Sequence, residues 1–392
     1  MYPLIHDSWS QKEIESINRV IKSNRFSMGP QIADFEEKFA KKFRVKYAIC
    51  VNSGSSANLI AIAALRFLKK AVMPGDEIIV PAIGWSTTYS PLFYLGFKPV
   101  FVDINAKSLN IDVDLIENQI SKKTKAILAV NLLGKSAEYK KIKLLCQKYN
   151  LHLIEDNCES MGAKYQSQYN GTLGLAGTFS FFYSHHITTI EGGMITTNDR
   201  QFYDICISLR AHGWLRNLDE SSHLYDKNVD DFRRMFWFVL PGFNVRPIEF
   251  TGAIGIEQLK KFDSMLKIRR ANHKLFIKLF ENDKYLYIQD YEKNHSSFSF
   301  ALILRKNNNN LRNKLIEYLK KKGIETRPIA SGNITRNPFI KYFNLPKKPN
   351  CKNANFVDMN GFMVGNHPID LTSNLKLFKK HIDSFFEKIE KV

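Results

Sequence analysis

Residues 47–70, YAICVNSGSSANLIAIAALRFLKK, combine the two patterns that decide the fold. The beginning, YAICV, is a short apolar run typical of a buried strand. A glycine-containing turn follows, and SSANLIAIAALRFLKK then has apolar residues at helical spacing. We therefore expect a strand, a turn and a helix in succession, which is the repeating unit of α/β proteins.

The same alternation continues through the first half of the chain. Further strand candidates, separated by helical segments, are DEIIVPAIG, KPVFVDIN, KAILAVNLLG and HLIEDNCES. This order predicts an α/β domain with a mostly parallel sheet. Residues 10–44 precede it and are expected to be helical, with a break at Gly29-Pro30. The stretch FSFFYSHHITTIEGGMITTND, residues 179–199, is predicted to form a strand, a tight turn and another strand.

The pattern changes after GFNVRP, where long helices frame one strand candidate, FSFALIL. This pattern of long helices with few strands is typical of a smaller α+β domain. We predict a large domain at residues 1–245 and a small C-terminal domain at residues 246–392, because 392 residues exceed one ordinary core.

Composition restricts the class of protein. With 44% hydrophobic residues and no apolar run near the roughly 20 residues of a membrane span, we expect a globular protein. The N-terminus has no export-signal pattern, so we expect a cytoplasmic location. The five cysteines are scattered without CxxC spacing, which predicts reduced thiols and no metal site.

The net charge of +19 raises the question of an anionic partner. The basic residues are spread through helical stretches, with no dense basic arm and no interleaved aromatic platform. We therefore expect no nucleic-acid binding, while a small anionic ligand stays open.

Two segments carry candidate site chemistry. VNSGSSANL places small and hydroxyl residues at a helix start, where free N–H groups bind anions, although Ser55 or Ser56 could simply cap the helix. HLIEDNCES puts Asp156 at the carboxyl end of a strand, where α/β sheets gather ligands. Asp156 either caps the next turn or pairs with a cationic ring nitrogen.

These segments, in this order, resemble the pyridoxal-phosphate (PLP) fold type I sugar aminotransferases, which modify nucleotide-linked 4-keto sugars. The resemblance covers essentially the whole chain, through FSMGP, GDEIIVPAIGWSTTYSP, IEDN, SFFYSHHITTIEGGMITTND and GFNVRPIEFTGAIGIEQL. It implies a large domain with a mixed, mostly parallel seven-stranded sheet flanked by helices, and a smaller C-terminal α+β domain.

The resemblance also implies roles for single residues. Gly54 and Ser55 would bind the cofactor phosphate, with help from Ser180 and, across a dimer interface, from Asn244. The remaining cofactor-binding residues would be Trp85, stacked on the ring; Asp156, at the pyridine nitrogen; and Glu159, near the phenolic oxygen. A core position is the alternative for Trp85. Because Asn244 would act across a dimer interface, the resemblance also implies a homodimer.

One position departs from the aminotransferases. Counting back from Glu191-Gly192-Gly193 places His185 where their motif has the cofactor-binding lysine. Imidazole cannot form the Schiff base that a primary amine forms, so we expect His185 to serve as an acid or base and the cofactor to be held non-covalently. The adjacent His186 is expected to be a turn residue with a satisfied hydrogen bond.

This change is similar to the PLP-dependent 3-dehydratases of nucleotide-linked 4-keto-6-deoxy sugars. A second similarity is independent of the histidine: Thr326-Arg327-Pro328 followed by residues 332–338, GNITRNP. The resemblance implies GDP-4-keto-6-deoxy-D-mannose and L-glutamate as substrates, with 2-oxoglutarate, ammonia and a 3-deoxy-4-keto sugar as products, in deoxysugar and O-antigen biosynthesis. Expected sugar-site residues are His212, Trp214, Arg327 and Asn333.

Three alternatives remain. A nucleotide-sugar 4-aminotransferase would need another lysine to reach the cofactor. An iron–sulfur 3-dehydratase would need four clustered cysteines, and only Cys206 and Cys351 follow the histidine motif. A catalytically dead regulatory relative is the third, and the joint presence of Trp85, Asp156 and Asn244 argues against it.

Overall fold

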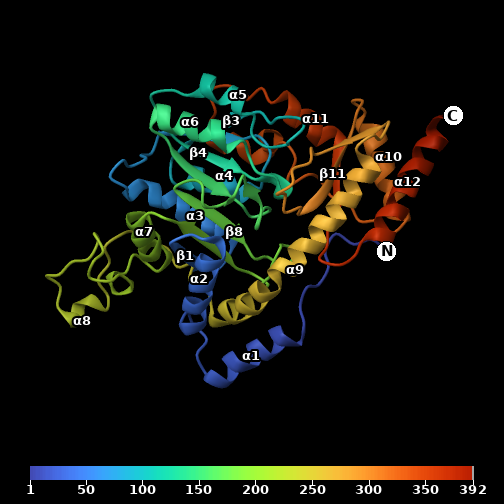
Figure 1. Cartoon of the computed structure of the whole chain (residues 1–392). Coiled ribbons are helices and arrows are strands. Elements are labelled where there is room, and N and C mark those ends of the chain that lie inside the picture. Colours follow the sequence, from blue (N-terminus) through green and yellow to red (C-terminus); the bar gives the residue numbers. More distant parts are fainter. Residues whose placement is uncertain (391–392) are drawn as a thin grey trace.

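A computed structural model describes residues 1–390 and contains a central seven-stranded sheet (Figure 1). Its strands, in spatial order, are β1 (Tyr47–Val51), β9 (Gly193–Thr197), β8 (Ala176–Ser180), β5 (His152–Asp156), β4 (Thr124–Val130), β2 (Glu77–Pro81) and β3 (Lys98–Val102). β9 pairs antiparallel with both neighbours, and the pairs from β8 to β3 are parallel. The expected mixed, mostly parallel seven-stranded sheet is confirmed.

Helices cover both faces of this sheet. One face packs against α3 (Gly54–Ala64), α4 (Ser86–Tyr94) and α7 (Arg200–Arg210), and the other against α2 (Pro30–Phe43), α6 (Tyr139–Tyr149) and α9 (Glu249–Phe280). In β1, Ile49 and Val51 face α3, whereas Ala48 and Cys50 face α2. Both sides of the strand are therefore buried, which explains its continuous apolar run.

The C-terminal part has its own antiparallel sheet of β10 (Leu286–Ile288), β11 (Ser299–Leu304) and β12 (Gly361–Gly365). Its helices are α10 (Asn309–Lys321), α11 (Lys352–Asn360) and α12 (Thr372–Glu390). The long α9 links the two sheets, because its start packs on α2 and its Phe276 and Phe280 enter the core of the second sheet (Figure 1). Tyr2 joins that core as well. The division at residue 245 stays a prediction.

The remaining α-helices and strands are peripheral: α1 (Gln11–Ser23), α5 (Val113–Ile116), α8 (Asp231–Arg234) and a hairpin of β6 (Lys164–Tyr165) with β7 (Gln168–Tyr169). In Figure 1, α8 projects from the main body. Within residues 1–390, no helix combines the length and the apolar character that crossing a membrane requires.

The connection between β8 and β9 differs from the expected tight turn. Pairing continues one residue past the strands, where the Phe181 N–H donates to the Gly192 carbonyl at 2.9 Å. Residues 182–191 then leave the sheet as a loop, which carries both histidines. The tight-turn prediction was wrong because alternation of residue types locates strands but does not fix how far the chain between them extends.

Candidate active site

A cavity of about 300 Å³ lies at the carboxyl ends of the parallel strands. It brings together eight residues that the sequence singled out: Gly54, Ser55, Trp85, Asp156, Glu159, Ser180, His185 and Arg327. They come from strand ends and helix starts of the main sheet, from the loops after β5 and β8, and from the segment between α10 and α11. Residues far apart in the sequence therefore form one site.

The start of α3 forms one end of this cavity. Ser53 is the N-cap, since its Oγ accepts from the Ser56 N–H at 3.1 Å, so the alternative that Ser55 or Ser56 is the cap was wrong. The Ser55 hydroxyl is free to face the cavity and contacts Thr87 Oγ1 at 2.8 Å. The first N–H groups of a helix lack intrahelical acceptors and attract anions. This end of the cavity suits a phosphate.

Gly54 lies at this end of the cavity, where there is no room for a side chain. A Cβ there would lie 2.5 Å from Ser180 Cβ and 3.1 Å from Cys158 Sγ. We expect Gly54→Ala to weaken PLP binding roughly tenfold or more, because even small displacements of positioned groups are costly. Absorbance titration with PLP measures the affinity. Gly75→Ala is the control for backbone strain away from the cavity, since its φ is +93° and a Cβ there meets no atom within 4 Å; an equal loss of PLP affinity in the control would contradict the role of Gly54.

Asp156 is held by three donors at the end of β5. Its Oδ2 accepts from Asn58 Nδ2 at 2.9 Å and from the Thr88 hydroxyl at 2.7 Å, and its Oδ1 accepts from the Cys158 N–H at 3.1 Å. Asn58 is fixed in turn by the Thr178 hydroxyl, which donates to its Oδ1 at 2.6 Å. Both carboxylate oxygens of Asp156 are therefore held as acceptors beside the cavity.

His185 has one ring nitrogen engaged and one available. Its Nδ1 lies 2.6 Å from the Cys158 carbonyl oxygen, which can only accept, so Nδ1 carries the proton. Nε2 is consequently the unprotonated nitrogen of the neutral ring. Burial lowers the pKa of His185 to about 4. At neutral pH this imidazole is therefore ready to accept a proton.

Glu159 and Arg327 place opposite charges in the cavity wall. Glu159 accepts the Leu133 N–H at 3.0 Å, and burial raises the pKa of its carboxyl. Trp85, the residue before α4, lines the same cavity with 56% of its surface exposed. It is therefore not a core indole, and its ring is available for stacking.

Four predicted site residues are not among those lining the cavity: His212, Trp214, Asn244 and Asn333. His212 and Trp214 pack on each other, with ring centroids 4.5 Å apart. Asn333 bonds inside its own turn, accepting from the Thr335 N–H at 3.0 Å, and donates to Asn355. Asn244 accepts from Arg246 Nε at 3.0 Å. Their binding roles stay predictions.

His186 is buried, and one of its ring nitrogens makes the expected hydrogen bond. Its Nε2 lies 3.2 Å from the Ser296 carbonyl, whereas its Nδ1 has no partner among the described residues. Burial lowers the pKa of His186 well below its ordinary value. It is therefore a neutral residue of the interior.

Sequence reasoning missed Asn58, Thr88 and Cys158, which surround Asp156. Asn58 had one usable signal: it lies four residues after Gly54 in a helix that otherwise reads as apolar. A buried polar residue on such a face needs a partner. Thr88 carried no comparable signal, because hydroxyl residues are common near helix starts.

Comparisons with known proteins point to one family. Residues 7–368 match the model of the DegT/DnrJ/EryC1/StrS aminotransferase family. GDP-4-keto-6-deoxy-D-mannose 3-dehydratase of Yersinia pseudotuberculosis is 47% identical over 378 residues, which make up 96% of each protein. Two solved structures have a TM-score of 0.94 and 45% identity, covering 97% of this chain and 100% of theirs. Both are GDP-4-keto-6-deoxymannose 3-dehydratase, one a mutant with bound GDP-perosamine and one with a trapped PLP–glutamate geminal diamine.

Proposed function

This chain belongs to the DegT/DnrJ/EryC1/StrS aminotransferase family, and from that premise we propose that it is a PLP-dependent 3-dehydratase of GDP-4-keto-6-deoxy-D-mannose. The observation that carries the proposal is His185, whose unprotonated nitrogen belongs to a cavity that has no lysine among its lining residues in the described chain. A site without a primary amine is suited to proton transfer rather than to covalent attachment of the cofactor.

The reaction balances with L-glutamate as the second substrate. The sugar loses its C3 hydroxyl and gains a hydrogen at C3, which is a two-electron reduction. Glutamate supplies those electrons as it becomes 2-oxoglutarate, and its nitrogen leaves as ammonia. The water released from C3 is consumed in the hydrolysis that frees the nitrogen, so the products are 3-deoxy-4-keto sugar, 2-oxoglutarate and ammonia.

The cavity residues fit the cofactor. The N-terminus of α3 with Gly54, Ser55 and Ser180 would hold the phosphate, Asp156 the protonated ring nitrogen, and Trp85 a face of the ring. When bound, PLP would carry the amino group of glutamate, and its pyridinium ring would hold the electron pair released by deprotonation and supply it for C3–O cleavage. Glu159 lies in the wall where the phenolic oxygen would be.

His185 moves the proton in this scheme. Its Nδ1–H is fixed on the Cys158 carbonyl, so Nε2 would be the atom that takes up a proton and returns it to the departing hydroxyl. The pKa of about 4 means that Nε2 is free over the whole neutral range. The base is therefore available without competing protonation.

A homodimer completes the proposal. Asn244 would reach the phosphate of the partner's cofactor. Large apolar side chains are exposed around α8, with Phe232 80%, Phe236 65% and Phe238 55% exposed, and contact with a second copy would cover them.

Arg327 is the basic residue that the cavity offers to the nucleotide sugar. We place the reaction in the cytoplasm, in the supply of a deoxysugar for lipopolysaccharide O-antigen.

The deciding experiment is a product assay with purified protein, PLP, L-glutamate and GDP-4-keto-6-deoxymannose. We expect mass spectrometry to show loss of the C3 oxygen from the sugar, and an enzyme-coupled assay to show one ammonia per sugar converted. A 4-amino sugar without ammonia would overturn the proposal in favour of an aminotransferase. Formation of 2-oxoglutarate with no change in this sugar would contradict the substrate assignment.

A further inference from the structure

Phe298 lies directly behind His185. It precedes β11, in the C-terminal part of the chain, and is 4% exposed. Its ring centroid is 5.1 Å from that of His185 and 5.8 Å from that of His186. Phe298 is not among the residues lining the cavity. Its ring contact with His185 is therefore an indirect link to the cavity.

Residues 295–298, here called the HSSF segment, are bonded to the main sheet's loops. The Ser296 N–H donates to the Gly134 carbonyl at 2.9 Å, and the Phe298 N–H donates to the Leu133 carbonyl at 3.0 Å. Leu133 in turn donates its own N–H to Glu159 at 3.0 Å. The HSSF segment thus contacts His185 through the Phe298 ring and is linked to Glu159 through one residue, Leu133.

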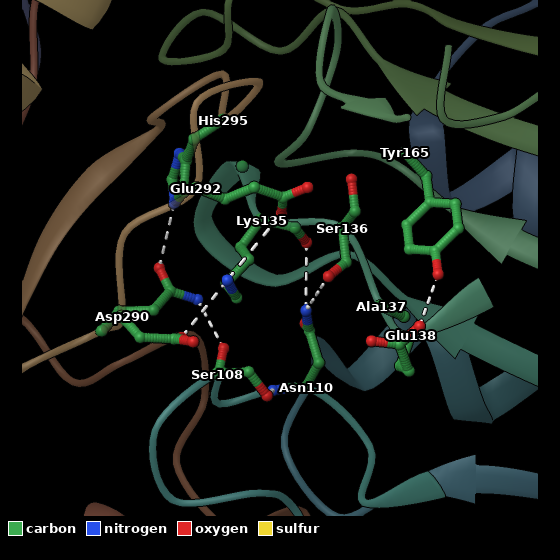
Figure 2. Close-up of polar contacts among 12 residues, drawn as sticks. Ser108, Asn110, Lys135, Ser136, Ala137, Glu138, Tyr165, Asp290, Glu292 and His295 are labelled. Atoms are coloured by element: carbon green, nitrogen blue, oxygen red, sulfur yellow. Dashed lines mark hydrogen bonds and ion pairs between the residues drawn. The ribbon is translucent and has the colours of Figure 1, made fainter. Parts of the chain in front are cut away.

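Polar contacts fix the start of this segment and the residues that precede it. His295 Nε2 lies 3.3 Å from Gln289 Oε1, and Gln289 donates to the Ser108 and Leu132 carbonyls at 2.7 and 3.1 Å. Figure 2 shows Lys135 between Asp290 and Glu292, with N–O distances of 3.3 and 3.8 Å. The Lys135 side chain is only 10% exposed, so screening by solvent is weak. These hydrogen bonds and ion pairs therefore fix the chain on the N-terminal side of Phe298.

We propose that Phe298 is a positioning residue for His185: its ring fixes the imidazole against the Cys158 carbonyl and keeps water away from it. The inference rests on the proposed function only for its effect on turnover. Loss of the ring would leave space beside the imidazole, because an aliphatic side chain cannot cover an aromatic face in the same way. The imidazole would then become hydrated and less ordered.

Hydration of His185 would change its pKa in a predictable direction. Burial is the main cause of the lowered pKa of His185, and the charges of Arg327 and Arg269 lower it further. Asp156 and the bond to the Cys158 carbonyl act in the opposite direction. Glu159 and neutral His186 complete the surroundings. Because removing Phe298 changes burial and none of these charges, the pKa should rise from about 4 toward 6.5.

The test compares Phe298→Leu with Phe300→Leu in the PLP-bound enzyme. Phe300 is equally buried but stacks on Phe276 in the other core, with ring centroids 4.4 Å apart. Diethyl pyrocarbonate modifies unprotonated imidazole, so its rate at His185, followed by peptide mass spectrometry, reports the pKa. Between pH 8 and 5 we expect a flat rate in the parent and in Phe300→Leu. In Phe298→Leu the rate should fall severalfold toward pH 5, and Phe298→Met should behave alike.

Turnover separates this inference from the proposed function. We expect kcat of Phe298→Leu to fall roughly tenfold with KM nearly unchanged, and its acid limb to move to higher pH. A flat modification rate in both Phe298 variants, or the same fall in Phe300→Leu, would overturn the positioning role. A shifted modification profile with an unshifted kcat profile would uphold the positioning role and overturn His185 as the base.

Discussion

Replacing His185 with asparagine is expected to lower kcat by roughly 10²- to 10⁴-fold, the usual contribution of a general acid–base group. PLP affinity should stay within about twofold, because the proposed phosphate and ring contacts come from other residues. Asparagine can still donate to the Cys158 carbonyl, which His185 contacts at 2.6 Å, but it offers no basic nitrogen. Steady-state kinetics and absorbance titration with PLP measure the two quantities.

The matched control is His152→Asn. His152 lies at the opposite end of β5 from Asp156 and contacts the Lys70 carbonyl at 3.0 Å. The same substitution there should leave kcat unchanged.

His185→Lys should divert the reaction toward a 4-amino sugar, because an amine can attach to PLP and complete transamination. Undiminished dehydration by His185→Asn would exclude His185 as the base.

Much of the fold could be predicted because its signals are local. The apolar run of β1, the helical spacing of α3 and the long periodic pattern of α9 depend on residues close in sequence. The break at Gly29-Pro30 was also confirmed, since α2 begins at Pro30. The β8–β9 connection was mispredicted because its length depends on what the loop contacts. Residues 182–191 extend to the cavity and to the HSSF segment, and no local pattern reports those contacts.

The candidate site was predictable where a motif and a strand end coincide. Asp156 and His185 belong to two such motifs, and the cavity brings both together. The contact of Phe298 with His185 could not be predicted from the sequence, because it joins positions more than a hundred residues apart. An apolar residue before a strand is also too common to serve as a signal. Asn244 differs again: a role across an interface cannot be tested within one chain.

Asp156→Asn is the second change with a large expected effect. The three groups that face the Asp156 oxygens are all donors, from Asn58, Thr88 and the Cys158 N–H. An amide in place of the carboxylate would point its own N–H groups at one or two of these donors, leaving buried groups unpaired. It would also remove the negative charge that we propose pairs with the protonated ring nitrogen of PLP.

Removing one partner of a buried ion pair costs about 3–5 kcal/mol, so the rate of 2-oxoglutarate formation should fall at least about a hundredfold. Single-turnover measurement with L-glutamate isolates this half of the reaction from the sugar. Asp103→Asn is the control, because Asp103 is also a buried strand-end aspartate but binds the N–H groups of Asn353 and Ala354 at the start of α11. That variant should lose thermal stability and keep its glutamate rate. If Asp156→Asn lost stability alone, Asp156 would be a structural cap, and the ring nitrogen would need another partner.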